Sequence, residues 1–165
     1  MQARGLAPAA QLRAVNDFYN QRIAFDTDAK VWGRVDYWAS PLELLDKDEG
    51  DCEDYAIAKY FTLRLLGMPA ASLRLVYVRA RLDEGVVQPH VVLAYLPQGG
   101  GEALILDNLL DAVTPISLRA DLSPVFSFNS DALWRGLEGS GGTPAVARLA
   151  AWRVVLQRAR AEGFP

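Results

Sequence analysis

The sequence is poor in two residues that often carry enzyme chemistry, with one cysteine, Cys52, and one histidine, His90, among 165 residues. A single cysteine excludes an internal disulfide, so a hydrophobic core must hold the fold together. The hydrophobic fraction of 51% is ample for such a core. None of the apolar runs approaches the roughly 20 residues that span a bilayer, which argues against membrane insertion.

The sequence also lacks a large excess of charge of either sign. The 17 basic and 20 acidic residues leave a net charge of −3, and the basic residues are scattered along the chain. This pattern does not indicate a nucleic-acid-binding surface. A chain of this length most simply forms one domain over residues 1–165, and it can bury roughly 70% of its unfolded surface.

The one cysteine lies at the start of a predicted helix. The run from Glu53 to Leu66 contains neither Gly nor Pro, and Gly67 and Pro69 then stop the helix. Cys52 would sit in the first turn, where unpaired N–H groups and the helix dipole favour a thiolate. A lone cysteine in an apolar protein is more often a small buried hydrophobe, so its partners must decide between these readings.

The one histidine opens a predicted strand, and a second predicted strand ends at Asp107. The two are separated by the turn residues Pro97–Gly101. A hairpin folded symmetrically about this turn sets Leu93 opposite Leu104 and His90 opposite Asp107. Opposed residues have Cβ atoms about 4.5–5.5 Å apart, close enough for a carboxylate to hold an imidazole N–H.

These three residues suit three catalytic roles. Cys52 would be the nucleophile, His90 its general base and later its acid, and Asp107 the group that orients the imidazole. The alternative is a histidine without a task and an aspartate that belongs to a turn. The sequence pattern therefore predicts a thiol-dependent enzyme without excluding that alternative.

Residues 46–54 contain six acidic side chains in nine positions. They could form a solvated turn that leads into the helix, or a calcium site, because Ca²⁺ takes clustered oxygen ligands. The spacing does not match an EF-hand. Carboxylates beside Cys52 should raise the pKa of its thiol, and a divalent cation would neutralise them and fix the loop.

Four blocks of the sequence resemble those of the bacterial transglutaminase-like cysteine proteinases of the LapG type. The blocks are DYWASP at 36–41, GDCEDYAIAKY at 50–60, HVVL at 90–93 and LDNL at 106–109. The resemblance runs from about Val15 to Trp134. It implies a Cys-His-Asp triad on Cys52, His90 and Asp107, and calcium ligands at Asp51 and Glu53, with Asp54 as a further candidate.

The resemblance also implies a biological setting. LapG-type members are periplasmic, calcium-dependent endopeptidases that cleave a large surface adhesin at a di-alanine site near its N-terminus and so release biofilm cells. An inhibitory periplasmic domain of a cyclic di-GMP-sensing membrane receptor, of the LapD type, sequesters them. Residues 1–5 lack the basic start and apolar core of a signal peptide, so the export signal is expected to be absent from this sequence.

Two rival functions remain open. A transglutaminase-type acyl transferase would use the same triad with an amine in place of water. A calcium-ordered binding module would carry the triad without using it.

The expected fold is α+β and papain- or transglutaminase-like, with N-terminal helices that carry the cysteine packed on an antiparallel sheet that carries the histidine and aspartate. The other predicted elements are helices at 9–25, 40–46 and 143–161 and strands at 73–82 and 122–129. Residues 32–38 are aromatic-rich, and we expect a loop that packs on the core and lines a groove. A side chain of this segment could complete an oxyanion hole with the Cys52 N–H. Arginines on the last helix are expected to face solvent.

Overall fold

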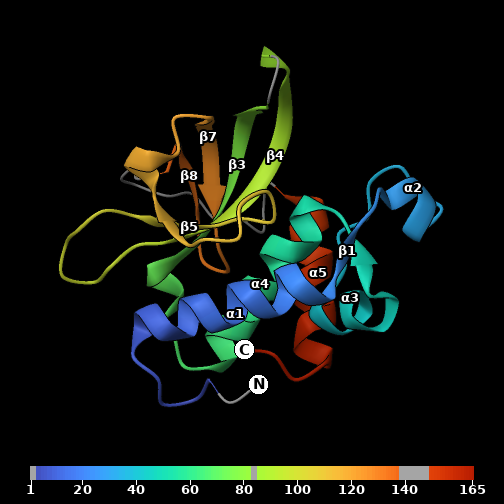
Figure 1. Cartoon of the computed structure of the whole chain (residues 1–165). Helices are drawn as coiled ribbons and strands as arrows, with labels where there is room; N and C mark the ends of the chain where they lie inside the picture. Colours follow the sequence, from blue (N-terminus) through green and yellow to red (C-terminus); the bar gives the residue numbers. More distant parts are fainter. Residues whose placement is uncertain (1–2, 83–84, 138–148) are drawn as a thin grey trace.

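The computed structural model describes residues 3–82, 85–137 and 149–165, and a layer of helices covers one face of an antiparallel sheet (Figure 1). The helices are α1 (Pro8–Arg22), α2 (Asp28–Val31), α3 (Pro41–Lys47), α4 (Cys52–Leu65) and α5 (Ala150–Ala161). Short 3₁₀ turns occupy Ala70–Ser72 and Ile116–Leu118. Among the described residues, none of the helices has the length and apolar character needed to cross a bilayer.

The sheet has six strands in the order β6-β5-β4-β3-β7-β8, and every neighbouring pair is antiparallel. They are β3 (Leu73–Arg81), β4 (Val87–Tyr95), β5 (Leu104–Leu106), β6 (Thr114–Pro115), β7 (Leu122–Phe128) and β8 (Leu133–Arg135). A separate parallel pair joins β1 (Ala24–Phe25) to β2 (Glu49–Gly50). This pair ties the end of α1 to the residues just before α4.

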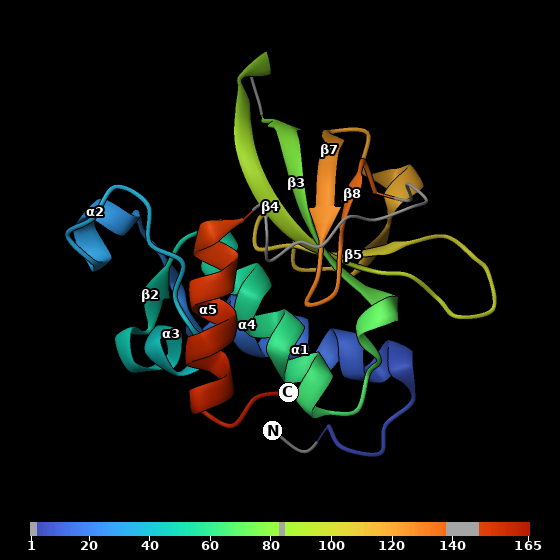
Figure 2. The ribbon, with the colours of Figure 1, turned by 180° about the vertical axis from the view of Figure 1, so that it is seen from behind.

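Helix α4 is the centre of the helical layer. It lies between α1 and α5, as the front and back views agree (Figures 1 and 2). Nine of its fourteen residues are buried, and its inner side packs on β4. The core between the layers includes Trp152 of α5, whose ring contacts Phe61 of α4 at a tilt and Phe128 of β7 edge to face. This packing fixes the helix that carries Cys52 against the strand that carries His90.

Most predicted elements are confirmed. The helix predicted at 9–25 ends at Arg22, because the chain turns extended at Ile23 to form β1. The helix predicted from Ser40 is α3, and a capping box between Ser40 and Glu43 closes its first turn. The strand predicted at 122–129 is β7. The last helix is described from Ala150, and its predicted start at Thr143 lies outside the described residues.

The predicted hairpin register is wrong by two residues. Leu93 pairs with Leu106 rather than with Leu104, and β4 begins at Val87, so His90 lies inside the strand and does not open it. The turn is centred one residue later than predicted, because Gly100 and Gly101 continue it with φ values of 85° and 123°. A shift of two residues keeps every side chain on its own face of the sheet, so Asp107 still shares a face with His90.

Candidate active site

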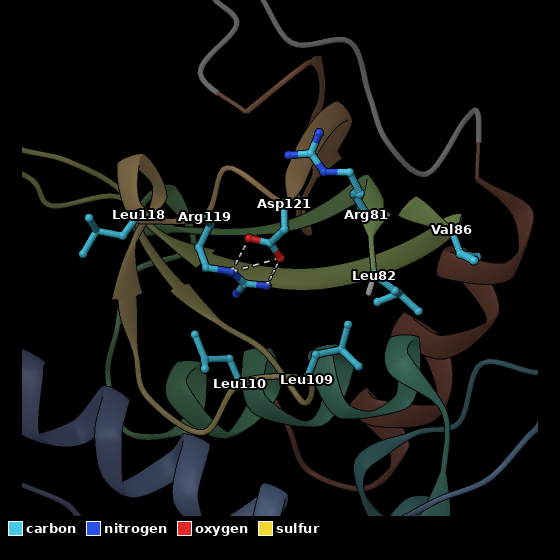
Figure 3. Close-up of a pocket in the computed structure, with 8 residues that line it drawn as sticks. All are labelled: Arg81, Leu82, Val86, Leu109, Leu110, Leu118, Arg119 and Asp121. Carbon is cyan, nitrogen blue, oxygen red and sulfur yellow. Dashed lines mark hydrogen bonds and ion pairs between the residues drawn. The ribbon is translucent and has the colours of Figure 1, made fainter. Parts of the chain in front are cut away.

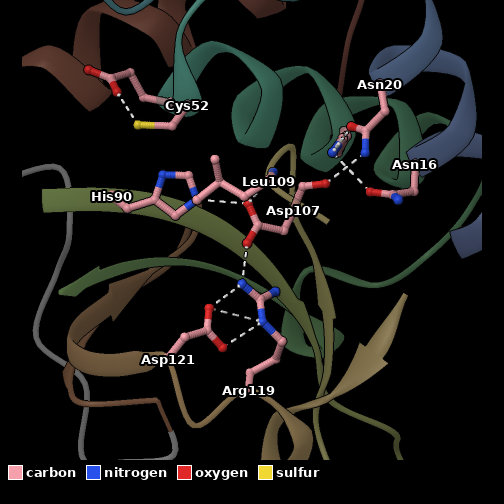
Figure 4. Close-up of polar contacts among 10 residues, drawn as sticks. Asn16, Asn20, Cys52, His90, Asp107, Leu109, Arg119 and Asp121 are labelled. Carbon is pink, nitrogen blue, oxygen red and sulfur yellow. Dashed lines mark hydrogen bonds and ion pairs between the residues drawn. The ribbon is translucent and has the colours of Figure 1, made fainter. Parts of the chain in front are cut away.

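Cys52 and His90 meet at one small pocket. Cys52 is the first residue of α4, and His90 lies in β4, the strand on which α4 packs. The pocket has a volume of about 300 Å³, and Trp38 and Tyr77 form part of its wall. In Figure 4 the Cys52 sulfur lies on the side of the His90 ring that is turned away from Asp107. The fold thus brings the two rarest chemical groups of the sequence to one place.

The carboxylate of Asp107 is buried and accepts three hydrogen bonds. Its Oδ1 accepts from His90 Nε2 at 2.7 Å and from the Leu109 N–H at 3.1 Å, and its Oδ2 accepts from Arg119 at 2.6 Å (Figure 4). A carboxylate can only accept, so His90 Nε2 carries the hydrogen of this bond. Nδ1 of the neutral ring is then the lone-pair nitrogen on the side of Cys52.

Arg119 is a member of this site that the sequence reading missed. Its side chain is only 4% exposed, and it bridges Asp107 and Asp121, the latter at 2.8 Å. It lies in an irregular stretch after Pro115, where no motif or periodicity marks it. Its guanidinium fixes the plane of the Asp107 carboxylate from the side opposite to His90.

These contacts set the charge of Asp107. Burial raises the pKa of its carboxyl, but the hydrogen bond and charge of His90, the Leu109 N–H and Arg119 outweigh burial and hold the pKa at about 2. Asp107 is therefore ionised throughout the neutral range, as a residue that orients an imidazole must be.

We expect Asp107→Asn to remove a pH-dependent part of the stability. The folded-state pKa lies below the unfolded value, so the ionised carboxylate contributes about 2.5 kcal/mol above pH 4 and loses it as the pH falls from about 4 through 2. Urea unfolding of both proteins from pH 7 to pH 3 measures this. The stability difference should be largest near neutral pH and narrow in acid, and a difference that does not change with pH would contradict the assignment.

A second cluster, of carboxylates, lies beside Cys52. Oxygens of Asp28, Asp51 and Asp54 lie within 4.8 Å of one another. Asp28 and Asp54 each accept a backbone N–H with one oxygen, from Tyr37 at 2.6 Å and from Ala39 at 2.7 Å. The remaining oxygens, and Oδ1 of Asp51, are buried and have no hydrogen-bond partner among the described residues. Three orphaned buried oxygens are a donor set that fits a hard cation such as Ca²⁺.

The pKa values of Asp51 and Asp54 are raised because these carboxyls are buried close to other carboxylates. Burial and repulsion from Glu53 and the neighbouring aspartates raise the pKa of Asp51 to about 9. Burial, with the charges of Asp28 and Glu53, raises that of Asp54 to about 7, although two backbone N–H bonds oppose it. Without a cation, these carboxyls resist being ionised together.

The structure arranges the predicted ligands unequally. Asp51 and Asp54 share the cluster with Asp28, which the sequence analysis did not select as a ligand. Glu53 instead accepts a hydrogen bond from the Cys52 thiol at 3.0 Å, although its carboxylate also lies near Asp51 and Asp28.

The position before Asp51 requires a glycine. A Cβ atom at Gly50 would meet Asp54 Oδ2 at 2.8 Å and the Leu44 side chain at 2.6 Å.

The thiol of Cys52 is held protonated in this arrangement. Burial raises its pKa most, followed by the charge and hydrogen bond of Glu53 and the charge of Asp51, and a hydrogen bond with the Val91 backbone opposes them only in part. The lowered pKa expected from the helix N-terminus is therefore overridden, first by burial of the thiol and then by the acids, whose effect the acidic run predicted. A cation among the carboxylates would offset their negative charge and so lower the pKa of the thiol.

The aromatic segment divides between the two predicted roles. Trp38 and the fully exposed Val35 line the pocket of Cys52, whereas Trp32 and Tyr37 stack on each other at 4.6 Å outside it. The expectation that the arginines of the last helix face solvent is wrong for Arg158. It donates to Glu43 at 2.6 Å and to the Trp38 carbonyl at 2.7 Å, so α5 holds this segment in place.

A larger hollow of about 800 Å³ lies beside Arg119 (Figure 3). Its wall contains the Arg119–Asp121 ion pair and several leucines, including Leu109 and the exposed Leu118. Neither Cys52 nor His90 borders it. The smaller pocket is therefore the candidate active site.

Comparisons with known proteins agree with this geometry. The family model of the bacterial transglutaminase-like cysteine proteinases matches residues 4–120. The EGTA-treated structure of Legionella pneumophila LapG is 38% identical, with a TM-score of 0.82 over 95% of this chain and 82% of that one. The calcium-bound structure is 37% identical, with a TM-score of 0.78 over 94% and 82%. No curated protein matches the sequence. The chain belongs to the bacterial transglutaminase-like cysteine proteinase family.

Proposed function

We propose that this protein is a calcium-dependent cysteine endopeptidase that cleaves a large cell-surface adhesin near its N-terminus, at a di-alanine site, and so promotes biofilm release. The observation that carries the proposal is the pocket that Cys52 and His90 share, with Asp107 bonded to the far side of the imidazole. The pocket is small, at about 300 Å³, and walled by aromatic rings, which suits side chains as small as alanine.

The chemistry follows from the positions of three groups. Cys52 Sγ attacks the peptide carbonyl carbon while its proton passes to His90 Nδ1. The protonated ring then delivers that proton to the leaving amine, and a thioester with Cys52 remains. Water, deprotonated by His90, attacks the thioester and restores the thiol. Asp107 stays ionised throughout and stabilises the imidazolium through Nε2.

The developing oxyanion needs two donors. The first is the Cys52 backbone N–H, because the first N–H groups of a helix have no intrahelical partner. We assign the second to the indole N–H of Trp38, the tryptophan of the aromatic segment that lines the pocket.

Calcium would be held by Asp28, Asp51 and Asp54, with Glu53 near enough to join them. When bound there it would offset the negative charge beside the thiol and order the residues that lead into α4. The calcium-bound and EGTA-treated structures of LapG support calcium as the ion, and the three buried oxygens without partners among the described residues support these ligands.

We extend the proposal to location and regulation by the same similarity. The protein would act in the periplasm, and an inhibitory periplasmic domain of a cyclic di-GMP-sensing receptor, of the LapD type, would sequester it. The net charge of −3 argues against a nucleic-acid partner.

Mass spectrometry of the products tests the reaction. The protein is incubated in calcium with an adhesin segment that contains Ala-Ala, with and without a primary amine. We expect two fragments whose masses sum to the substrate plus one water, unchanged by the amine. Incorporation of the amine would favour an acyl transferase. Full binding of the segment by Cys52→Ala with no turnover by the native protein would favour a binding module.

A further inference from the structure

A buried lysine lies beneath the site. Lys59 is on α4, about two helical turns after Cys52, and its side chain is 1% exposed. Its ammonium donates to Asn20 Oδ1 at 2.7 Å and to Asn16 Oδ1 at 2.9 Å, both on α1. It also lies 5.6 Å from the centre of the Tyr55 ring. The ammonium is thus paired, but among the described residues no acidic side chain bonds to it.

The two asparagines connect Lys59 to the loop that contains Asp107. Asn20 Nδ2 donates to the Asp107 carbonyl at 2.8 Å, and Asn16 Nδ2 donates to the Asp111 carbonyl at 2.6 Å (Figure 4 shows both asparagines). An ammonium has donors only, so it forces both amide oxygens inward and both NH₂ groups toward the loop. Lys59 therefore sets which way each amide points.

Burying a charged lysine costs more folding free energy than a purely structural role would justify. Burial lowers the pKa of Lys59 to about 7, and the charges of Asp107, Asp111 and Asp17 offset only part of that cost. Well-packed apolar side chains of similar volume often serve stability as well as buried charges do. What apolar side chains cannot do is hold two loop carbonyls at fixed points.

The contacts close a ring around the reaction centre. It runs from Cys52 along α4 to Lys59, across Asn20 to the backbone of Asp107, and from the Asp107 carboxylate to His90, which faces Cys52 again. Arg119 fixes the carboxylate of Asp107, while Asn20 fixes its backbone. A displacement of this backbone would move the imidazole relative to the sulfur.

We propose that Lys59 and Asn20 are positioning residues, which hold the Asp107 backbone at a fixed place relative to α4 and thereby set His90 against Cys52. The kinetic consequence rests on the proposed function. The structural consequence, a fixed His90–Asp107 pair, does not.

A matched pair of substitutions tests this inference. Asn20→Asp and Asn16→Asp each keep an oxygen on Lys59 and replace the NH₂ donor by an oxygen that repels a loop carbonyl. Only Asn20→Asp disturbs Asp107 itself. We expect it to lower kcat roughly 10- to 100-fold with KM changed less than about 2-fold, and Asn16→Asp to lower kcat less than about 3-fold, at similar melting temperatures. Asn20→Ala and Asn16→Ala, which add no charge, should give the same contrast.

Nuclear magnetic resonance gives a second readout that needs no substrate. His90 is the only histidine, so the imidazole region of the spectrum reports on its Nε2 proton alone. This signal should shift or broaden in Asn20→Asp and stay in place in Asn16→Asp. Equal effects of the two substitutions, or an unchanged signal and kcat in a folded Asn20→Asp, would overturn the inference. If the protease assignment fails instead, the native protein lacks turnover but the spectral contrast persists.

Discussion

Replacing His90 by alanine is expected to lower kcat/KM at least about 1000-fold, and Cys52→Ala to lower it at least as far, to a small residual rate. Without the imidazole, the pocket offers the thiol proton only carboxylates, such as Glu53, which accepts a hydrogen bond from the thiol and raises its pKa. A carboxylate is a weaker base than an imidazole by about two pKa units. The leaving amine would also lose its proton donor. The measurement is kcat/KM on the adhesin segment in saturating calcium.

The double variant Cys52→Ala/His90→Ala provides the control for a shared mechanism. Residues that act as a unit are strongly non-additive, so it should be no worse than Cys52→Ala alone. The variants that lack His90 should unfold at a lower midpoint but remain folded at the assay temperature, because Asp107 keeps its bonds to Arg119 and Leu109, and unfolding curves check this.

Alkylation by iodoacetamide repeats the test without a substrate. Cys52 is the only cysteine, so the mass of the labelled protein reports on it alone. In calcium, the native thiol should react with an apparent pKa below the free value of about 8.5, and His90→Ala should lose that advantage. Unimpaired turnover or an unchanged alkylation rate in His90→Ala would remove the histidine from the mechanism.

The elements that carry the site were predictable because their signals are local. The helix after Cys52 has an uninterrupted run and a clear stop, and a capping box marks α3 at Ser40. Strand parity was equally informative. It placed His90 and Asp107 on one face even though the register was wrong by two residues, because only an odd shift exchanges the faces.

What the sequence could not supply are contacts between distant segments. Asn20 reaches the carbonyl of Asp107 across 87 positions, and the ammonium of Lys59 reaches Asn16 across 43. Each of these residues, read alone, is an ordinary polar member of a helix. Asp28 was missed for the same reason, since it joins the carboxylate cluster only when the fold brings the first residue of α2 close to Asp51 and Asp54.

Removal of calcium is expected to lower the melting temperature by about 5–10 °C and to suppress turnover. Three buried oxygens have no hydrogen-bond partner among the described residues, and the carboxyls that carry them have raised pKa values because they are buried and repel one another. A ligand that binds only the folded state adds about 2.7 kcal/mol at 100 times its Kd, which corresponds to a shift of this size for a chain of this length. Thermal unfolding in excess calcium and in EGTA measures it.

Asp28→Asn tests whether calcium binds to the carboxylate cluster or to the acidic run at residues 46–54. Asp28 lies far from Cys52 in sequence but contributes an orphaned oxygen, so its loss should weaken calcium binding at least about 10-fold by calorimetry. Asp46→Asn is the matched control, because Asp46 belongs to the acidic run but not to the cluster, and it should bind calcium as the native protein does. Equal loss in both variants would show that general negative charge, and not a built site, attracts the ion. The same melting temperature in calcium and in EGTA would show that calcium does not stabilise the protein. Some other group would then have to lower the pKa of the Cys52 thiol.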